Sequence, residues 1–198
     1  MSTVQTDRLT FNALTLAQGA INAVQWALPY GSNNQLESLK ATRTGEDPQG
    51  QTGARVNAIR EGLYILLRQP HAPLPPYFAE GGALYWCAMF SGVALYYGAG
   101  NCGEHASLAF NYLTLFGFPG IEIQRVNSDF NEHAFCVITW DGCKDPVICD
   151  AWASQPQACL YSHFFANPKL FPSTKVPCPN TKSMLTIASP KRTWGMTS

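Results

Sequence analysis

Three residues whose side chains could act together lie in the second half of the chain: Cys102, His133 and Asp150. Cys102 follows a glycine-broken turn and opens a run of helical periodicity, where the positive end of the helix dipole favours a thiolate. A histidine beside that thiolate would lower the thiol pKa and later protonate a leaving group. A carboxylate behind the histidine would fix its tautomer and stabilise its charge. The set therefore predicts a nucleophilic triad.

Four neighbours are candidates for substrate binding or for an oxyanion site. Asn101 and Gly103 flank the nucleophile, and N–H groups at a helix start could hold an oxyanion. His105 lies three residues after Cys102 on the same helical face, so it could instead be the base or a zinc ligand. Trp152 could wall off water beside the triad or stack on substrate.

A zinc site is the weaker reading of these residues. The sequence contains no C-x-x-C pair. His133 and Cys136, three apart on a predicted strand, would point to opposite faces of the sheet. The glycines also lack the lysine and the preceding strand of a phosphate-binding loop. We therefore expect neither a metal nor a cofactor.

Hydrophobic periodicity predicts the elements that must position the triad. Apolar residues at helical spacing predict helices over 14–28, 56–67, 83–97 and 101–116. After Gly117 the period becomes two, which predicts strands over 121–126, 134–140 and 147–152. Helices followed by antiparallel strands indicate an α+β fold.

The turn between the last two strands decides whether the triad can form. Asp141 and Gly142 are a strong two-residue hairpin signal. In that register His133 faces Asp150 directly, on one side of the sheet and about 5 Å apart at Cβ. A five-residue loop over 141–145 would put the two on opposite faces. The triad thus requires the first register or a compensating bulge.

We expect a single domain over 1–198 with three parts. Residues 1–76 form a helical N-terminal part with a polar loop at 31–52. Residues 77–155 form the catalytic core. Residues 156–198, rich in proline and poor in periodicity, form a C-terminal wrap.

Composition excludes several partners and compartments. Thirteen basic and thirteen acidic residues cancel, and charged residues are only 13% of the chain, which argues against nucleic acid or an anionic membrane surface as partner. Between Glu80 and Glu104 no residue is charged, but six glycines and several polar residues favour a core helix over a membrane span.

Seven cysteines at irregular spacing indicate free thiols and a reducing compartment. Residues 1–12 lack the features of a classical signal peptide. The expected location is the cytoplasm, or a reducing host compartment reached by secretion without such a peptide. Nothing in the sequence indicates an oligomeric state.

Three segments together resemble the motifs of transglutaminase-like proteins. The run over 98–119, GAGNCGEHASLAFNYLTLFGFP, resembles the nucleophile motif, a G-x-C followed by a helix and a G-[IF]-P end. HAFCVI, from His133, resembles the histidine–alanine–aromatic motif on a strand. ICDAW resembles the third motif, with Ala151 where proline is usual.

The resemblance implies a papain-like core, with the nucleophile at the N-terminus of a central helix that packs on a small antiparallel sheet. It implies that Cys102 is the nucleophile, His133 the general base and acid, and Asp150 the orienting carboxylate. Members of this superfamily include proteases, crosslinking acyl transferases and glutamine deamidases, and several bacterial toxins and injected effectors of about this size carry the triad.

The expected activity is therefore that of a thiol hydrolase or acyl transferase acting on protein amide bonds. A glutamine deamidase or a cysteine protease of a bacterial effector or toxin fits best, with a protein of the host as substrate. Two alternatives remain open: a transglutaminase-like binding module without catalysis, and a coenzyme A-dependent acyl transferase. Nothing basic near Cys102 supports the second of these.

Overall fold

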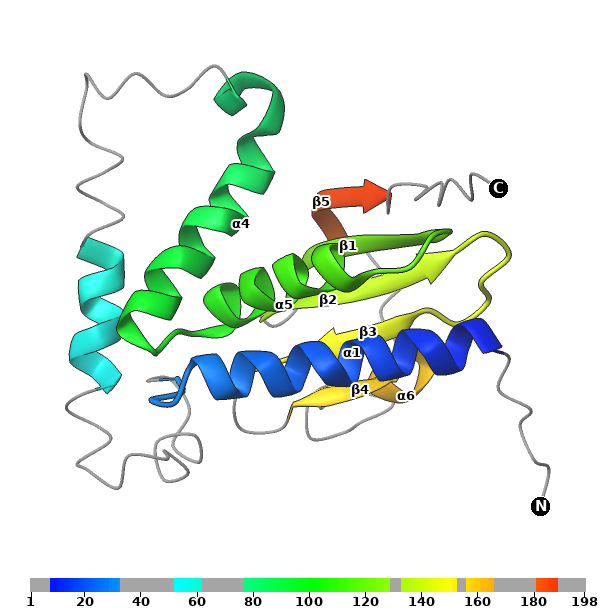
Figure 1. The fold of residues 1–198 in the computed structure, drawn as a ribbon, viewed down its shortest axis with the longest axis horizontal. Coiled ribbons are helices and arrows are strands. Elements are labelled where there is room, and N and C mark those ends of the chain that lie inside the picture. The colour runs from blue at the N-terminus through cyan, green and yellow to red at the C-terminus, as the bar shows by residue number, and fades with distance from the viewer. Residues whose placement is uncertain are drawn as a thin grey trace, which may run out of the picture.

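The computed structural model describes the backbone of residues 8–32, 52–61, 77–128, 133–152, 156–165 and 181–188. Side chains are described over 8–32, 52–61, 87–126, 133–152 and 156–164. Within these ranges the fold is α+β, as the sequence predicts. Three longer helices, α1 (Arg8–Ala27), α4 (Tyr77–Tyr97) and α5 (Cys102–Phe116), accompany one antiparallel sheet (Figure 1). A further helical segment spans 52–61.

The sheet has five strands in the order β4-β3-β2-β1-β5. Their bounds are β1 (Ile121–Ser128), β2 (His133–Trp140), β3 (Val147–Asp150), β4 (Gln157–Leu160) and β5 (Thr181–Ala188), and the short helix α6 (Tyr161–Phe165) follows β4. Helix α1 packs over β3 and β4, and helix α5 packs over β1 and β2 (Figure 1). The start of α5 therefore lies beside β2, the strand that carries the candidate base.

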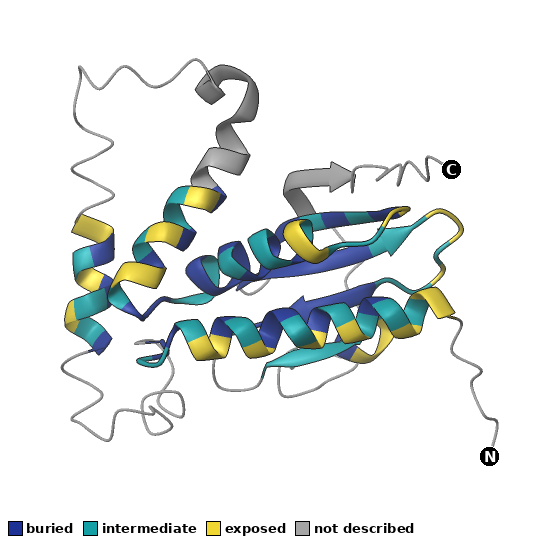
Figure 2. Cartoon of the chain, viewed as in Figure 1, coloured by how far each residue is buried: buried dark blue, intermediate teal, exposed yellow. Residues whose placement is uncertain are grey.

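The larger core cluster lies between these two helices and the sheet, and a smaller one joins Phe135 and Ile148 of the sheet to Phe164 of α6. Small residues on the buried face of α1, such as Ala13, Ala17 and Ala20, let the helix approach the strands closely. The thiol of Cys149 on β3 lies within hydrogen-bonding distance of the Ala17 carbonyl, at 3.5 Å. Figure 2 shows the buried residues concentrated in the central strands and on the inner faces of the helices.

The predicted helices are confirmed where the structure describes them. The predicted segment 56–67 is helical up to residue 61, in a helix that begins at residue 52, and the rest of the segment lies outside the described residues. Most of the polar loop at 31–52 and the linker at 70–76 also lie outside them. The uncharged stretch forms most of α4, with Cys87, Ser91 and Ala94 buried. Among the described residues, no helix is long and apolar enough to cross a membrane.

The three predicted strands are present, but the region beyond residue 155 differs from expectation. The sequence pattern predicts no strand there, whereas β4 and β5 form the two edges of the sheet. Strand β4 has only four residues, too few for a period of two to stand out. Part of the predicted wrap is therefore sheet.

The register between β2 and β3 also differs from the predicted one. The predicted turn is present, because the Cys143 N–H donates to the Trp140 carbonyl at 3.0 Å and Gly142 has a positive φ of 73°. However, β3 begins only at Val147, after Pro146, which has no N–H to donate to a ladder. The extra residues before Val147 shift the pairing.

This shift corrects the prediction that His133 faces Asp150 directly. Cys136 pairs with Cys149, so the ladder lies two residues away from the predicted register. Continuing it by one residue sets Phe135, not His133, opposite Asp150. Because side chains alternate faces with a period of two, an even shift leaves His133 and Asp150 on the same face. They approach each other along a diagonal of the ladder.

Candidate active site

The nucleophile candidate occupies the first position of α5. Asn101, the N-cap residue, has an extended conformation with φ −94° and ψ −167°. Its backbone N–H donates to the Glu104 carboxylate at 2.9 Å. This contact satisfies a backbone donor that the helix itself leaves without an acceptor. The thiol of Cys102 is thereby held, half-buried, at the positive end of the helix dipole.

The turn before the helix requires glycine at position 100. A Cβ there would lie 2.5 Å from the Cβ of Glu104, closer than two carbon atoms can pack. Glu104 is fully buried, and Arg60 from the helical segment 52–61 lies 3.4 Å from its carboxylate. The glycine-broken turn predicted before Cys102 is thus required for the packing of a buried carboxylate beside the nucleophile.

The candidate base and carboxylate form a close buried pair. His133 opens β2, and its Nε2 lies 2.7 Å from Oδ2 of Asp150, the last residue of β3. The other carboxylate oxygen accepts the backbone N–H of Trp152 at 3.1 Å. His133 and Asp150 are 5% and 3% exposed, so the pair is shielded from water.

The thiol and the imidazole influence each other. Burial raises the pKa of Cys102, but hydrogen bonding to His133 and to the backbone of Ala134 outweighs it, and the pKa falls below its ordinary value of 9.0. Burial likewise lowers the pKa of His133, while the hydrogen bonds to Asp150 and Cys102 raise it to about 9. Each of these hydrogen bonds stabilises the charged form of its group, which explains both directions. Both shifts favour the charged forms, thiolate on Cys102 and imidazolium on His133.

The second ring nitrogen of His133 is left for the thiol. Among the described residues, Nδ1 is buried and has no hydrogen bond of good geometry, whereas Nε2 is bound to Asp150. A thiol–imidazole contact is often long before substrate binds. The arrangement lets Nδ1 exchange a proton with Cys102 while Asp150 holds the opposite side of the ring.

His105 occupies a different position from the base. Its Nδ1 lies 2.9 Å from the Asn101 carbonyl, which can only accept, so Nδ1 carries the proton. Burial lowers the pKa of His105, which keeps the ring neutral. The histidine that interacts with Cys102 is His133. In the described part of the chain, no group of three His, Cys, Asp or Glu side chains could hold a metal ion.

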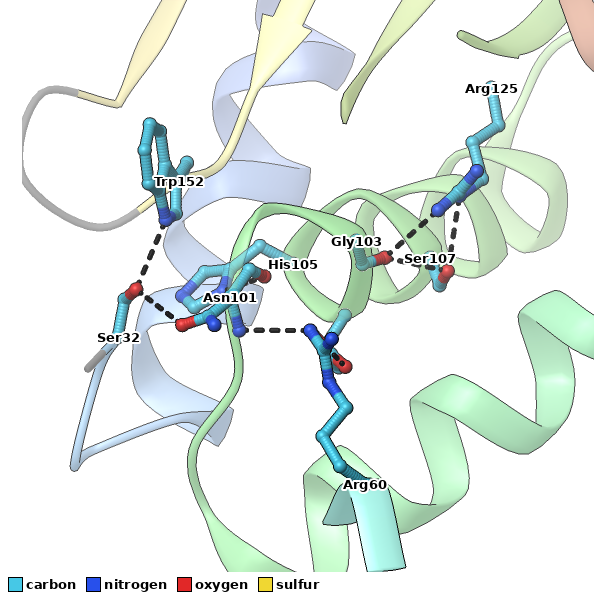
Figure 3. A network of polar contacts seen from close by, with 9 residues as sticks. Ser32, Arg60, Asn101, Gly103, His105, Ser107, Arg125 and Trp152 are labelled. Atoms are coloured by element: carbon cyan, nitrogen blue, oxygen red, sulfur yellow. Dashed lines mark hydrogen bonds and ion pairs between the residues drawn. The ribbon is translucent and has the colours of Figure 1, made fainter. Parts of the chain in front are cut away.

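Trp152 contacts the base rather than offering a free donor. Its ring lies 4.7 Å from the His133 ring, centroid to centroid, with the planes tilted by 36°. Its indole N–H donates to the Ser32 hydroxyl at 3.2 Å (Figure 3). The indole N–H is therefore engaged, whereas the N–H groups of the first turn of α5, including that of Gly103, have no acceptor within the helix itself.

Sequence reasoning missed three residues around the helix start: Ser32, Arg60 and Arg125. Ser32 is buried and donates to the Asn101 side-chain oxygen at 2.8 Å. Arg125, buried in β1, donates to the Gly103 carbonyl at 3.3 Å on the other side of the helix (Figure 3). A charged residue inside an alternating strand is the signal that could have identified Arg125. No local signal identifies Ser32.

The other thiols contrast with Cys102. All six described cysteines are free, as the sequence predicts, and Cys178 lies outside the described residues. Burial raises the pKa of Cys87, Cys136 and Cys149, and together with nearby aspartates raises that of Cys159 to about 11. Of the five cysteines whose pKa is shifted, only Cys102, at the start of α5, has a lowered pKa.

The sequence matches no protein-family model, and it has no significant match among curated proteins.

Proposed function

We propose that this chain is a thiol hydrolase or acyl transferase that acts on protein amide bonds, with Cys102 as nucleophile, His133 as general base and acid, and Asp150 as orienting carboxylate. The observation that carries the proposal is the 2.7 Å pair of His133 and Asp150, whose imidazole in turn depresses the pKa of the Cys102 thiol. A structural cysteine would need neither partner.

In the first half-reaction the Cys102 thiolate attacks the carbonyl carbon of an amide. The negative charge that develops on the carbonyl oxygen is stabilised by N–H groups of the first turn of α5. The His133 imidazolium then gives its proton to the leaving nitrogen, and the C–N bond breaks. The products are a thioester on Cys102 and a free amine, or ammonia when the amide is a glutamine side chain.

In the second half-reaction neutral His133 takes a proton from water or from an acceptor amine. The activated acceptor attacks the thioester carbonyl, the C–S bond breaks, and Cys102 leaves as thiolate beside imidazolium. Asp150 stabilises the imidazolium in both half-reactions. Water as acceptor gives deamidation or proteolysis, and an amine gives transamidation.

The resemblance in sequence gives the proposal its finer form. We propose a papain-like, transglutaminase-like core, a protein substrate, and a role as a glutamine deamidase or cysteine protease of a bacterial effector or toxin. Two arrangements support this core: a nucleophile at the start of a helix that packs on an antiparallel sheet, and a histidine and an aspartate on adjacent strands. A reducing compartment as the place of action is consistent with six free thiols.

The test compares the wild-type protein with Cys102→Ala on a protein extract of a candidate host. Mass spectrometry distinguishes glutamine converted to glutamate from new peptide termini. We expect one of these products with wild-type protein, none with Cys102→Ala, and full activity with Cys143→Ala, which removes a half-buried thiol outside the site.

Labelling with iodoacetamide tests the same site without a substrate. We expect Cys102 to react faster near neutral pH than the other thiols. In the mass-spectrometry test, equal amounts of product from wild-type protein and from Cys102→Ala would contradict the proposal. A Cys102 no more reactive than Cys143 would favour the alternative of a binding module.

A further inference from the structure

We propose that Ser32 is a positioning residue that fixes the acid–base half of the triad relative to the nucleophile. This inference rests on the proposed function and deepens it. Ser32 belongs to neither half: it lies after α1, 69 residues before Asn101 and 120 before Trp152. Its hydroxyl nevertheless contacts a neighbour of each half.

The hydroxyl contacts a residue on each side. It accepts the indole N–H of Trp152 at 3.2 Å and donates its own proton to the side-chain oxygen of Asn101 at 2.8 Å (Figure 3). Ser32 is completely buried, so its hydroxyl is satisfied by the protein rather than by bulk water. A hydroxyl can do both because it carries one donor and two acceptor lone pairs.

On one side, the contact reaches both acid–base residues through Trp152. The indole ring lies against the His133 ring at 4.7 Å, and the backbone N–H of the same residue binds Asp150 at 3.1 Å. The orientation of the indole is therefore coupled to that of the imidazole. Holding the indole N–H sets the face against which His133 rests.

On the other side, the contact reaches the nucleophile through the N-cap. Asn101 immediately precedes Cys102, and its carbonyl and N–H bind His105 and Glu104. A hydrogen bond to its side chain thus acts on the residue from which α5 begins. Displacing this residue would displace the thiol relative to the His133 ring.

The backbone around Ser32 is itself held against the segment that leads to the nucleophile. Gly31 forms a parallel bridge with Ala99, and its carbonyl accepts the Gly100 N–H at 3.0 Å. Gly31 and Gly98 have positive φ values of 65° and 66°, which glycine adopts without strain. Ser32 is therefore presented from a fixed backbone, as a positioning residue requires.

The test measures the rate of Cys102 alkylation by iodoacetamide as a function of pH, with the modified peptide identified by mass spectrometry. Ser32→Ala deprives the half-buried Trp152 donor and the half-buried Asn101 acceptor of this partner. We expect a loss of about tenfold in the alkylation rate at neutral pH and a shift of the profile to higher pH. Trp152→Phe, which keeps a ring but removes the indole N–H, should lower the rate in the same direction.

Two further variants separate positioning from stability. Ser32→Thr keeps the hydroxyl and should retain most of the wild-type rate. Ser91→Ala removes another buried hydroxyl that joins two segments, since Ser91 donates to the Cys87 carbonyl and accepts from Asn111 at 2.8 Å. It lies away from the triad, so we expect a loss of stability with the alkylation profile unchanged.

The outcomes distinguish the two proposals. A wild-type Cys102 that reacts no faster than the other thiols would overturn the proposed function, and this inference with it. A reactive wild-type Cys102 whose profile is unchanged in Ser32→Ala would overturn this inference alone. If Ser32→Ala does not fold, Trp152→Phe decides: an unchanged profile overturns the positioning role, and a shifted one supports it.

Discussion

Nε2 of His133 lies 2.7 Å from the carboxylate of Asp150 although the two residues are not partners in the β2–β3 ladder. They meet along a diagonal of one sheet face, a separation that side chains of this length can span. The carboxylate also accepts the Trp152 N–H, which holds it in place. The charge of Asp150 is therefore directed at the imidazole from a fixed position.

Asp150→Asn should reverse the pKa shift of His133. Without the carboxylate, burial becomes the dominant influence and lowers the pKa of the imidazole from about 9. The thiol would lose its cationic partner, so the pKa of Cys102 should rise. We expect amidase activity to fall by about a hundredfold or more, because asparagine would neither fix the tautomer of the imidazole nor stabilise its positive charge.

NMR titration of the His133 ring and the alkylation profile of Cys102 check this prediction. Asp141→Asn, an exposed carboxylate in the hairpin turn, is the matched control and should change neither. An unshifted His133 titration in Asp150→Asn would show that the carboxylate does not control the ring.

Alkylation and turnover should separate at high pH. The pKa of Cys102 lies below 9.0, so the thiolate and the alkylation rate are lost as the pH falls through that lowered pKa. The pKa of His133 is raised to about 9, so the imidazolium is present below this value and is lost as the pH rises through it. Turnover needs that proton for the leaving nitrogen, whereas alkylation needs only the thiolate.

The expected result is a bell-shaped profile for amide cleavage and a plateau for alkylation, both measured on the wild-type protein. Amide cleavage that stays constant well above pH 9 would contradict the assignment of His133 as the acid.

Arg60 should influence the nucleophile through Glu104. The negative charge of Glu104 raises the pKa of Cys102, and the Arg60 guanidinium lies 3.4 Å from that carboxylate. Arg60→Ala removes the opposing charge, so we expect the thiol pKa to rise and alkylation at neutral pH to slow by about threefold or less, since Arg60 is exposed. Arg60→Lys keeps the charge and should behave as wild type.

Glu104→Gln should act in the opposite direction and lower the thiol pKa. Alkylation profiles of the three variants, recorded at low and high salt, check both signs. A thiol pKa that falls in Arg60→Ala would refute this coupling.

Gly100→Ala and Gly92→Ala should have opposite effects on stability. The new Cβ at position 100 would lie 2.5 Å from the Cβ of Glu104, so we expect a loss of about 1–3 kcal/mol in the free energy of unfolding. A Cβ at the exposed position 92 in α4 meets nothing within 4 Å. There alanine should stabilise the protein by up to about 1 kcal/mol through helix propensity.

Urea denaturation of both variants measures the two changes. Equal stability of Gly100→Ala and wild type would mean that the turn before Cys102 can move away from Glu104.

Local patterns were sufficient for much of the fold. The 3.6-residue period placed α1, α4 and α5, and the change to a period of two located β1, β2 and β3. The same reasoning brought His133 and Asp150 to one sheet face, although it assigned the wrong register. The error arose because the Asp141-Gly142 turn forms but the residues up to Pro146 do not pair.

Long-range contacts could not be predicted in this way. Ser32 meets Asn101 and Trp152 only because α1 returns the chain to the start of α5, and no period or motif records that approach. The edge strand β4 was missed because four residues carry too little alternation. The ion pair of buried Glu104 with exposed Arg60 likewise depends on how the segment 52–61 packs.

The candidate site joins parts of the chain that are far apart in sequence: the end of α1, the start of α5, and strands β2 and β3. In an unfolded chain, Cys102 would have neither the imidazole nor the helix dipole beside it, and its thiol would behave like the other six. Thiolate character is therefore a property of the completed fold. Recovery of enhanced Cys102 reactivity would report that these distant parts have come together, and until then a newly made chain would react at Cys102 no faster than at its other cysteines.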